Sequence, residues 1–547
     1  MKRYKTYMLS LIILLAANSC IDDKFFDLTN PPESPWITLS EFDRAPVGLY
    51  SNLFVGHEWD NPYVNIIIPK ISSGDDVDWV SYEEPGYLRK TKEYQRYNTT
   101  AWPELYKVIG GANDALGFVD RNGGNPYPDA SESDITNNLN RIVGELHFLR
   151  GFCYYLLQTT FGHAYVPGGA NSTPDIPLRT TYPTDATDAK NPKIGTTKEV
   201  FAQIIADLSK AKELLPEKYD PATMPVSYQE RATKFAASAM LMRAYFQRGD
   251  YDSARMECDY IIDQNGGQFD LSEDPIEAWN KSSATRGREV IFYIPLYDLS
   301  AGGGNNHLTF FNAFDPAPPK TSGELHMGKS TIKRLGWMDN PQTLDTVIKF
   351  NARVDKRFTQ LFSVRYPKKI AKPDQTTDGQ NREQIVNRST IWCYKYWRGP
   401  LVKWTNVPII RLAEVYLTRS IIRFRAGDLA GAADDLNVVR KRAWNTDVGG
   451  PYVDIKSGDI TEQMINDERL IEMFGENDRI DYLRGLKVDI PKGERGMQPI
   501  DPNGGPEPDE RPNEFTTEPD PYTSENFVWA IPIEEYHYNE SLKKKTP

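Results

Sequence analysis

The sequence lacks the features that mark membrane-spanning, zinc-dependent or nucleotide-dependent proteins. After its first 20 residues it has no apolar run that approaches the roughly 20 residues needed to cross a bilayer. Its six histidines form no H-E-x-x-H motif and have no cysteine neighbours. The glycines at 302–304 are not followed by the Lys-Ser/Thr of a phosphate-binding loop, and no nucleophile elbow is present. A flexible turn is the default interpretation of that triplet.

Positive charge and paired cysteines are also scarce. Lysine and arginine number 64 against 76 aspartates and glutamates, which gives a net charge of −12. An acidic surface argues against nucleic acid, because affinity for nucleic acid comes largely from neutralising phosphates with basic side chains. Apart from Cys20, the cysteines are Cys153, Cys258 and Cys393, an odd number without a C-x-x-C pair. Cys153 and Cys258 lie in helical patterns, where a free cysteine usually packs as a small apolar residue.

The N-terminus carries a targeting signal. Basic residues at 2, 3 and 5 precede a short apolar run, and Asn18 and Ser19 lead to Cys20. This layout is typical of a secretory signal, and a cysteine at this point resembles a bacterial lipoprotein signal. We expect residues 1–19 to be removed, Cys20 to be lipidated, and residues 20–37 to form an acidic tether. The alternative is an ordinary cleaved signal with a chance cysteine.

From residue 38 onward the pattern predicts one mostly α-helical domain, 38–547, interrupted by long insertions. Thr196 and Glu199 form a capping box before a helical apolar pattern that ends at Pro216. Residues 145–160 are apolar almost all round, which is typical of a buried helix. The insertions, about 54–100 and 300–400, have no long periodic stretches, with short strands expected at 289–295 and 391–397. The composition of residues 491–522 predicts a surface loop. The apolar residues 527–533 predict that the C-terminus is docked on the body of the protein.

Two segments read as diverged copies of one helix–turn–helix unit, residues 239–262 and 415–438. Each has an apolar helix, a Gly-Asp pair (Gly249-Asp250 and Gly427-Asp428) and a second helix rich in small residues. Glycine suits the left-handed end of a helix, and aspartate accepts backbone N–H bonds at the start of the next. Such units are typical of tetratricopeptide-like repeats.

The order of motifs along the whole chain resembles the SusD-like (SusD/RagB) family of surface lipoproteins from glycan-degrading Bacteroidetes. Glu476-Asn477-Asp478 departs from the family's usual Glu-Gly-Arg. The matching segments are Trp102–Tyr106 with Asn113, Gly144–Leu157 with Phe161-Gly162 and Val166-Pro167, Asp207-Leu208 with Ala211 and Leu215-Pro216, Gly249-Asp250, Glu289–Phe292, Pro408–Leu417, Gly427-Asp428, Asn437 with Val439-Arg440 and Arg442-Ala443, Asp467–Arg484, and Ala530–Pro532.

The resemblance implies a tetratricopeptide-like helical scaffold with a few short strands, and a binding protein rather than an enzyme. Such a protein captures an oligosaccharide at the outer-membrane surface and delivers it to a SusC-like TonB-dependent transporter. The helical repeats would face the transporter and the insertions would build the ligand site. No cofactor is implied.

A sugar-binding site needs flat aromatic rings for the C–H faces of the sugar and polar groups for its hydroxyls. Clusters in the insertions combine both kinds, and Trp79 is the leading single candidate. For any one of these aromatics the competing interpretation is packing within its own loop, and for residues 392–397 it is a core strand. The acidic cluster at 75–78 predicts a solvated turn, with calcium binding as the alternative. The candidate ligand-binding residues are Asp76, Asp78, Trp79, Tyr82, Tyr87, Asn305, Phe311, Asn312, Phe314 and Trp337.

Two other function classes stay open. A glycoside hydrolase needs two carboxylates about 5–9.5 Å apart across a cleft, and no pair stands out in the sequence. A scaffold that binds only protein, such as a peptide-importing relative, would also use aromatic side chains at its contact surface.

Overall fold

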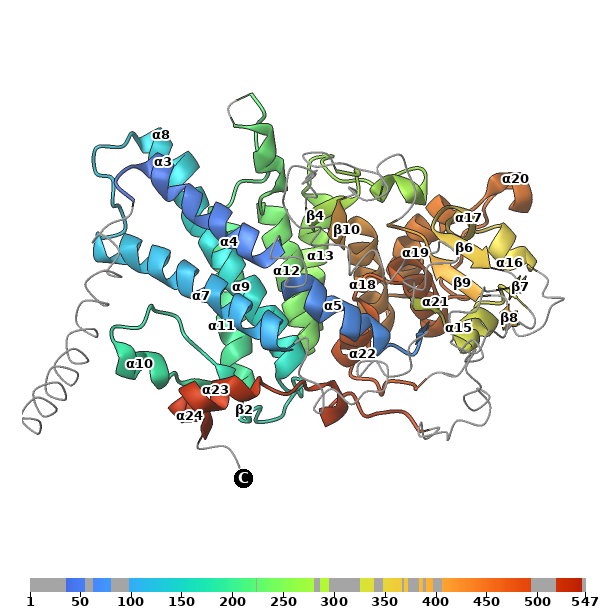
Figure 1. Ribbon diagram of the computed structural model, residues 1–547. Coiled ribbons are helices and arrows are strands. Elements are labelled where there is room, and N and C mark those ends of the chain that lie inside the picture. The colour runs from blue at the N-terminus through green and yellow to red at the C-terminus, as the bar shows by residue number, and fades with distance from the viewer. Residues whose placement is uncertain are drawn as a thin grey trace, which may run out of the picture.

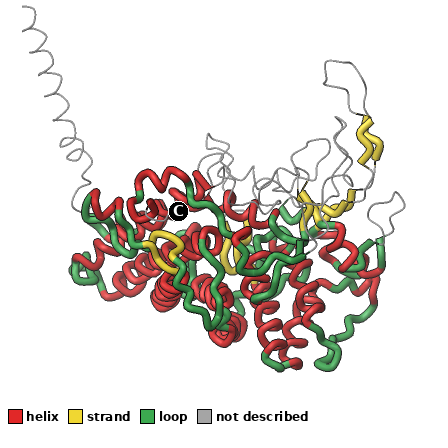
Figure 2. The backbone as a smooth tube through the Cα atoms, turned by 90° about the horizontal axis from the view of Figure 1, so that it is seen from below, coloured by secondary structure: helices red, strands yellow, loops and turns green. Residues whose placement is uncertain are grey.

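The structure is a computed structural model. It describes residues 36–54, 62–79, 98–222, 224–279, 286–294, 325–338, 348–365, 368–371, 383–386, 390–396, 406–492 and 518–543. Figure 2 shows that helices make up most of this body and that strands occur as a few short segments. The mostly α-helical fold predicted from the sequence is confirmed.

Successive long helices pack side by side in chain order. Helix α7 packs on α9, α9 on α11, α11 on α12, and α12 on α13. Helix α13 then contacts α18, which pairs with α19, so the two helix–turn–helix units meet although they are far apart in sequence. Figure 1 shows this row running from α7 and α9 at one end to α19 and α21 at the other. The long helices are α7 (Asn98–Arg121), α9 (Asn140–Phe161), α11 (Thr197–Leu214), α12 (Lys234–Arg248), α13 (Tyr251–Asp263), α18 (Leu412–Arg425), α19 (Leu429–Ala443), α21 (Glu462–Met473) and α22 (Arg479–Leu486).

Both Gly-Asp turns have the predicted geometry. Gly249 ends α12 with a φ of 74°, and the Asp250 side chain accepts a hydrogen bond from the Ser253 backbone N–H at the start of α13. Gly427 has a φ of 85°. Asp428 caps α19 by accepting from the backbone N–H of Gly431. The capping box of Thr196 and Glu199 at the start of α11 is likewise confirmed.

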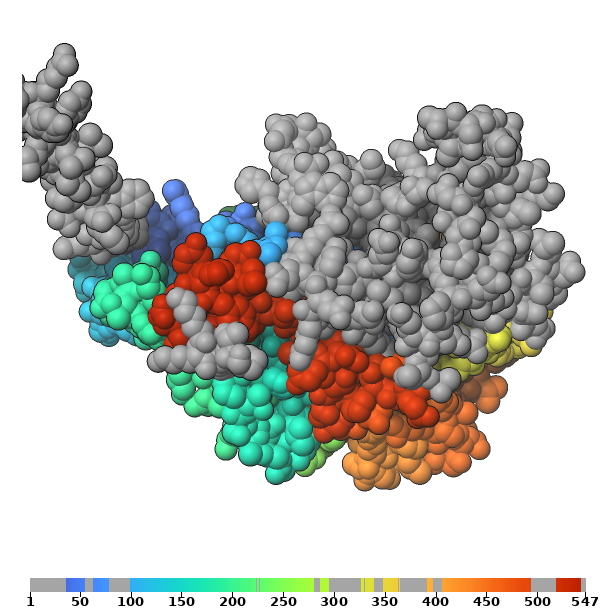
Figure 3. All heavy atoms as spheres, turned by 60° about the horizontal axis from the view of Figure 1, so that its bottom comes forward, coloured from blue at the N-terminus to red at the C-terminus, as the bar shows by residue number. Residues whose placement is uncertain are grey.

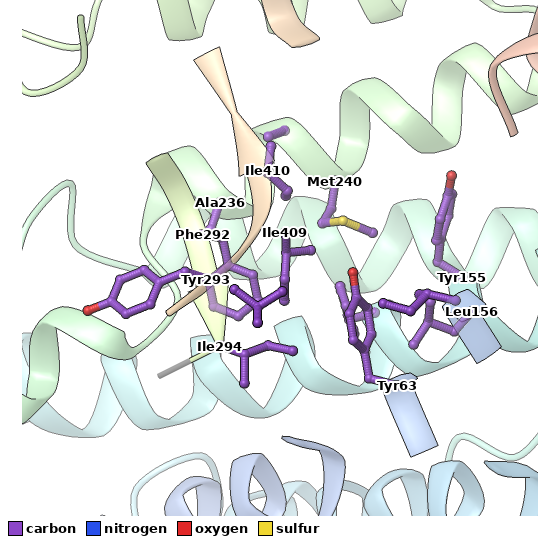
Figure 4. Packing of buried hydrophobic residues seen from close by; sticks show 14 of the residues in the cluster. Tyr63, Tyr155, Leu156, Ala236, Met240, Phe292, Tyr293, Ile294, Ile409 and Ile410 are labelled. Atoms are coloured by element: carbon purple, nitrogen blue, oxygen red, sulfur yellow. The ribbon is translucent and has the colours of Figure 1, made fainter. Parts of the chain in front are cut away.

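Helix α9 lies at the centre of the core. Most of its side chains are buried, as its all-round apolar pattern predicts. Figure 4 shows Tyr155 and Leu156 of α9 near Tyr63 of α5 and Met240 of α12. In the same region Phe292 of β4 and Ile409 of β10 pack against each other, so this core joins helices and strands from both halves of the chain.

The N-terminal insertion contains a buried helix that the sequence analysis did not predict. Helix α5 runs over Pro62–Ser72, and every one of its residues is buried. The β-branched run Ile66–Ile68 and Pro69 both disfavour a helix locally. Packing against α7 and α22 outweighs that local preference. The other N-terminal helices are α3 (Leu39–Phe42) and α4 (Arg44–Phe54).

Within the described ranges, the strands form one four-stranded sheet and three pairs. The four-stranded sheet has the order β1–β5–β9–β6, and the pairs are β10–β4, β2–β3 and β7–β8. Strand β4 confirms the strand predicted at 289–295, and β9 confirms the one predicted at 391–397 only as far as Cys393, after which residues 395–396 form a turn. The strands are β1 (Val77–Trp79), β2 (Pro174–Pro177), β3 (Ile194–Thr196), β4 (Val290–Ile294), β5 (Leu325–Met327), β6 (Phe362–Arg365), β7 (Lys368–Ala371), β8 (Glu383–Val386), β9 (Thr390–Cys393) and β10 (Val407–Arg411).

The C-terminal segment is docked on the helices, as predicted. The backbone N–H of Trp529 donates to the carbonyl of Thr160 at 2.9 Å. His163 bridges Asp175 and Glu525 through its two ring nitrogens, at 2.5 and 2.7 Å. In Figure 3 this segment covers part of the N-terminal half. The short helices are α8 (Glu132–Asp134), α10 (Ala186–Lys190), α15 (Lys329–Arg334), α16 (Phe350–Arg353), α17 (Lys356–Gln360), α20 (Thr446–Gly449), α23 (Ile533–Tyr538) and α24 (Glu540–Lys543).

Candidate functional site

The two insertions predicted to bind ligand are joined by a sheet. Strand β1 pairs antiparallel with β5, with Val77 opposite Met327 and Trp79 opposite Leu325. The chain leaves β1 after Trp79 and enters β5 at Leu325, so residues 80 and 324 are each one peptide bond from the same cross-strand pair. The register therefore attaches both insertions to one end of the sheet, although Trp79 and Leu325 lie far apart in the sequence.

A third part of the chain reaches the same end of the sheet. His326 of β5 lies opposite Trp392 of β9, and these strands are also antiparallel. Strand β9 therefore runs toward the end where β1 stops, and Tyr396 follows it there. Trp392 and Tyr396 are buried, at 5% and 1% exposed. The prediction that residues 392–397 pack in the core rather than form a ligand platform is confirmed for these two side chains, and the predicted strand ends at Cys393.

Strand β1 is held to the helical scaffold by ion pairs. Asp75 accepts two hydrogen bonds from Arg479 of α22, at 2.6 and 2.8 Å. Lys70 of α5 donates to Asp481, also on α22, at 2.8 Å. The carbonyl of Asp76 accepts from the N–H of Gly328 at 2.8 Å, just beyond β5. These contacts hold the start of β1 and the end of β5 on α22, which is the opposite end of the strand pair from Trp79 and Leu325.

Asp75 and Asp76 do not form the solvated acidic turn that the sequence predicts. Both are buried, at 5% and 4% exposed. Asp75 is paired with Arg479, whereas Asp76 Oδ1 accepts no hydrogen bond. Burial and the neighbouring Asp75 charge raise the pKa of Asp76 to about 7. The prediction that Asp76 contacts ligand is therefore corrected: in this structure its carboxyl group lies beneath the surface.

Trp337 is also a core residue. Its side chain is 1% exposed, and its ring makes edge-to-face contacts with Phe358 and Phe362 at 5.1 and 5.3 Å. A stacked sugar needs an open ring face. The prediction of an exposed stacking platform at Trp337 is wrong, because the ring is almost fully buried, although Trp337 is among the residues that line a cavity beside α15 and α21. This packing could not be predicted from the local sequence, because Phe358 and Phe362 lie more than 20 residues after Trp337.

The remaining candidates stay predictions. The backbones of Asp78 and Trp79 lie in β1, but their side chains are outside the described part of the structure. The calcium alternative at 75–78 is likewise untested for Asp78. The candidates that lie wholly outside the described residues are Cys20, Tyr82, Tyr87, Asn305, Phe311, Asn312 and Phe314.

Sequence reasoning missed a buried cluster of charges between the scaffold and the sheet. Glu472 of α21 is fully buried and accepts hydrogen bonds from Arg411, Arg442 and Arg357, at 2.8, 2.7 and 2.9 Å. These arginines hold the pKa of Glu472 well below its usual range. Lys395, just after β9, donates to the backbone carbonyl of Glu472 at 2.7 Å. Glu472 belongs to the matching segment 467–484, and its charge joins α21 to Arg357, Arg411 and Arg442.

The described residues contain no cluster of three or more histidine, cysteine or acidic side chains that could hold a metal ion. In the same part of the chain, no helix is both long enough and apolar enough to span a bilayer. The three cysteines Cys153, Cys258 and Cys393 are free and buried.

Two family models match the chain. The model described as starch-binding associating with outer membrane matches residues 63–246, and the model of the SusD family matches residues 288–545. Together they include α5 and α22, the scaffold helices that hold β1.

Relatives and solved structures agree with these matches. SusD-like protein P2 of Formosa agariphila is 25% identical over 529 residues, covering 92% of this chain and 93% of that protein. A SusD superfamily protein from Bacteroides thetaiotaomicron has a similar structure, with a TM-score of 0.67 at 20% identity, over 92% of this chain and 99% of that one. A SusD-like carbohydrate binding protein from Bacteroides fragilis gives a TM-score of 0.62 at 19% identity, over 93% of this chain and 100% of that one.

Proposed function

Because the chain belongs to the SusD family, we propose that it is a cell-surface lipoprotein that binds an oligosaccharide and passes it unchanged to a SusC-like TonB-dependent transporter. One observation carries the proposal beyond family membership. The pairing of Trp79 with Leu325 brings two insertions rich in aromatic and amide side chains to one end of a sheet. Rings and amides gathered at one place are what a carbohydrate site requires.

The rigid support of this sheet suits binding. The ion pairs of Asp75 and Lys70 with α22 fix the segment that leads into β1. A strand that is already fixed loses less entropy when a ligand binds beside it. Two or three stacking contacts of about 1 kcal/mol each, added to burial, give a Kd between about millimolar and micromolar. Such an affinity favours capture followed by release to a transporter.

A hydrolase is the less favoured function. Asp76 has a pKa near that of a general acid, but a general acid must reach the bond that it protonates. The cavity beside Asp76 has a volume of about 10 Å³, which is room for about one water molecule. Glu472 is held ionised by three arginines and is buried. These carboxyl groups therefore fit a structural role.

The proposal is tested with purified residues 21–547 on a glycan array and in affinity gels, with chromatography of the glycan after incubation. We expect retention of at least one glycan and no cleavage products. Cleavage would establish the hydrolase instead. Binding to peptides but to no glycan would establish a peptide-importing protein.

Substitution of Trp79 tests the location of the site. Trp79→Ala should weaken glycan binding about tenfold or more, because one stacking contact and its burial are lost. The melting temperature should change little if the ring lies in the ligand site. Tyr538→Ala is a matched control, because Tyr538 is 72% exposed on α23, far along the chain from both insertions. A large loss of stability in Trp79→Ala would place this ring in the core and refute the assigned location.

A further inference from the structure

A polar cavity larger than the one beside Asp76 lies away from the end of the sheet where the insertions attach. It has a volume of about 280 Å³ and is lined by residues of α15, the α16–α17 segment, the end of α19 and α21. Figure 1 groups these helices at one end of the molecule. Strand β5 begins at the insertions with Leu325 and leads into α15, whose last residue, Arg334, lines this cavity. We call it the α19–α21 cleft.

The walls of the α19–α21 cleft are fixed by backbone contacts. Asp355 and Trp444 form an isolated antiparallel bridge between the α16–α17 segment and the end of α19. The N–H of Asn445 donates to the carbonyl of Val354 at 2.7 Å. Asp355 also accepts two hydrogen bonds from the Arg357 guanidinium, each 2.9 Å long. A pocket held in this way exists before any ligand arrives, as most small-molecule sites do.

The charges that line the cleft balance. Three guanidinium groups face three carboxylates, so the lining carries no net charge. An anion would be repelled by the carboxylates and a cation by the guanidinium groups, while an apolar ligand would leave both without water. The six residues are Arg334, Arg357 and Arg440, and Asp355, Asp467 and Glu468.

Several of these groups keep hydrogen-bonding capacity for a ligand. Arg334 donates through Nε to Asp467 at 2.8 Å, and its side chain is 31% exposed. Arg440 lies 3.6 Å from Glu468 through Nε and is 33% exposed. A guanidinium has five N–H donors, so both arginines retain donors that can point into the cleft. Glu468 Oε1 is 2.7 Å from Arg357 but accepts no hydrogen bond of good geometry.

An aromatic ring completes the lining. Trp444 lines the cleft at the end of α19, and its Nε1–H donates to the carbonyl of Gly450 at 2.9 Å. Its ring packs edge to face on Tyr452, with 5.7 Å between the two ring centroids. These two contacts fix the indole and leave its nitrogen unavailable to a ligand, so it can offer only its apolar surface.

We infer that the α19–α21 cleft binds one neutral sugar residue, as a second carbohydrate site apart from the end of the sheet that ends in Trp79 and Leu325. Residues 334–337 and 351–357 of the second insertion form one wall of this cleft, and α19 and α21 form the other. Sugar hydroxyls both accept from guanidinium groups and donate to carboxylates, and the C–H face of the ring packs on an indole. The cavity volume lies just under the ~300–1,000 Å³ usual for larger ligands, which suits a single sugar ring. The inference rests on the proposed function only in taking the ligand to be a carbohydrate.

The test uses the full mature chain and simple sugars. Saturation-transfer NMR and titration calorimetry are run with glucose, galactose, mannose, xylose and rhamnose, and with glucuronate and glucosamine as charged comparators. We expect at least one neutral sugar to bind in the millimolar range and to bind more tightly than both charged comparators. Failure of every neutral sugar to bind, or tighter binding of a charged one, would overturn the inference.

Arg440→Met assigns the binding to the cleft, because methionine keeps much of the apolar stem and removes the donors. It should weaken the neutral sugar about tenfold or more. Arg353→Met is the matched control, since Arg353 is exposed on α16 and does not line the cleft. If Arg440→Met fails to fold, Asn351→Ala, at an exposed residue of the lining, takes its place with the same expectation. Equal affinity of the cleft variant and the wild type would refute the site.

The same measurements separate this inference from the proposed function. Glycan binding that is lost in Trp79→Ala, without any effect of Arg440→Met on simple sugars, would uphold the proposed function and remove the cleft site. Binding of a simple sugar that depends on Arg440, in a chain that retains no longer glycan, would uphold the cleft and remove the proposed function.

Discussion

Asp75 and Asp76 are neighbours in sequence with different environments. The Asp75 carboxylate has a bidentate guanidinium partner, whereas Asp76 Oδ1 is buried without a hydrogen bond. A run of acidic residues beside a glycine is usually solvated, and nothing near it in the sequence indicates otherwise. The partner that draws the run inward, Arg479, lies about 400 residues away in the chain. Contacts of that kind cannot be predicted from local pattern.

Asp76→Asn should change how stability depends on pH. The pKa of Asp76 is about 7 in the folded chain and near 3.8 when unfolded. Between these values the unfolded state releases the proton while the folded state keeps it, so the wild type loses stability as pH rises from about 4 to 7. The Asn variant avoids this loss, so its advantage should grow over that range and stay constant above it. Urea unfolding at several pH values measures the difference.

Asp129→Asn, at an exposed position, is the control for this experiment and should show no comparable trend. A difference between Asp76→Asn and wild type that is the same at pH 4 and pH 7 would contradict the raised pKa.

Glu472→Gln should be strongly destabilising. The carboxylate accepts from three guanidinium groups in a fully buried site, and glutamine can neither balance their charge nor accept through both ends. Breaking a buried ion pair typically costs about 3–5 kcal/mol. The midpoint of urea unfolding should fall while the slope of the transition stays the same. Glu132→Gln, at an exposed residue of α8, should leave the midpoint unchanged. A shift of Glu472→Gln no larger than that of this control would show that the cluster adds little to stability.

At the scale of elements, the sequence predicted what depends on local chemistry. The Gly-Asp turns and the capping box follow from backbone conformation and side-chain hydrogen bonds a few residues apart, and the structure has them where they were predicted. Helix α5 was missed because its residues favour a strand locally and become helical through packing on α7 and α22. The pairing of β1 with β5 could not be predicted either, since the two strands are short and lie far apart in sequence.

Alanine at the two turn glycines should cost different amounts. Gly427 has a left-handed φ of 85° and open space around an added Cβ. Gly427→Ala should therefore lower the free energy of unfolding by about 1 kcal/mol, which is the cost of a left-handed conformation for alanine. At Gly249 an added Cβ would lie 2.7 Å from Pro167 Cγ. Because this clash adds to the conformational cost, Gly249→Ala should lower the free energy of unfolding by more than Gly427→Ala does. Urea unfolding of both variants measures this order.

Gly110→Ala provides a control of opposite sign. Gly110 lies within α7 with no atom near an added Cβ, so alanine should be neutral or stabilising by about 0.5–1 kcal/mol. If Gly427→Ala behaved like Gly110→Ala, the left-handed turn would not be needed between α18 and α19.

At the scale of the whole molecule, the helical row acts as a support and the insertions as the variable part. The core cluster that contains α9 reaches from Phe42 to Trp529, so both ends of the described chain are packed on the same body. Arg479 of α22 fixes the start of β1, and the short strand carries this support to the end where the insertions attach. The sequence could assign the scaffold because its motifs recur in order, but it could only locate the ligand residues to the level of loops.

The tether predicts where this body resides in the cell. Cys20→Ser should abolish lipidation, because the acyl chains have no other attachment point in the predicted signal. Each buried CH₂ contributes about 0.8 kcal/mol, so the loss of several chains should move the protein from the membrane fraction to the soluble fraction. Metabolic labelling with palmitate, followed by fractionation and surface protease treatment of intact cells, measures both effects.

Cys153→Ser is the matched control for that experiment, because Cys153 is a free, buried cysteine within α9. It should still be labelled and remain in the membrane fraction, even if its stability falls. Purified Cys20→Ser should bind the same glycan as the wild type, since no candidate ligand-binding residue belongs to the tether, yet cells that carry it should take up that glycan poorly. Normal uptake by Cys20→Ser cells would mean that capture does not require attachment to the membrane, and the proposed delivery to a transporter would have to occur from solution.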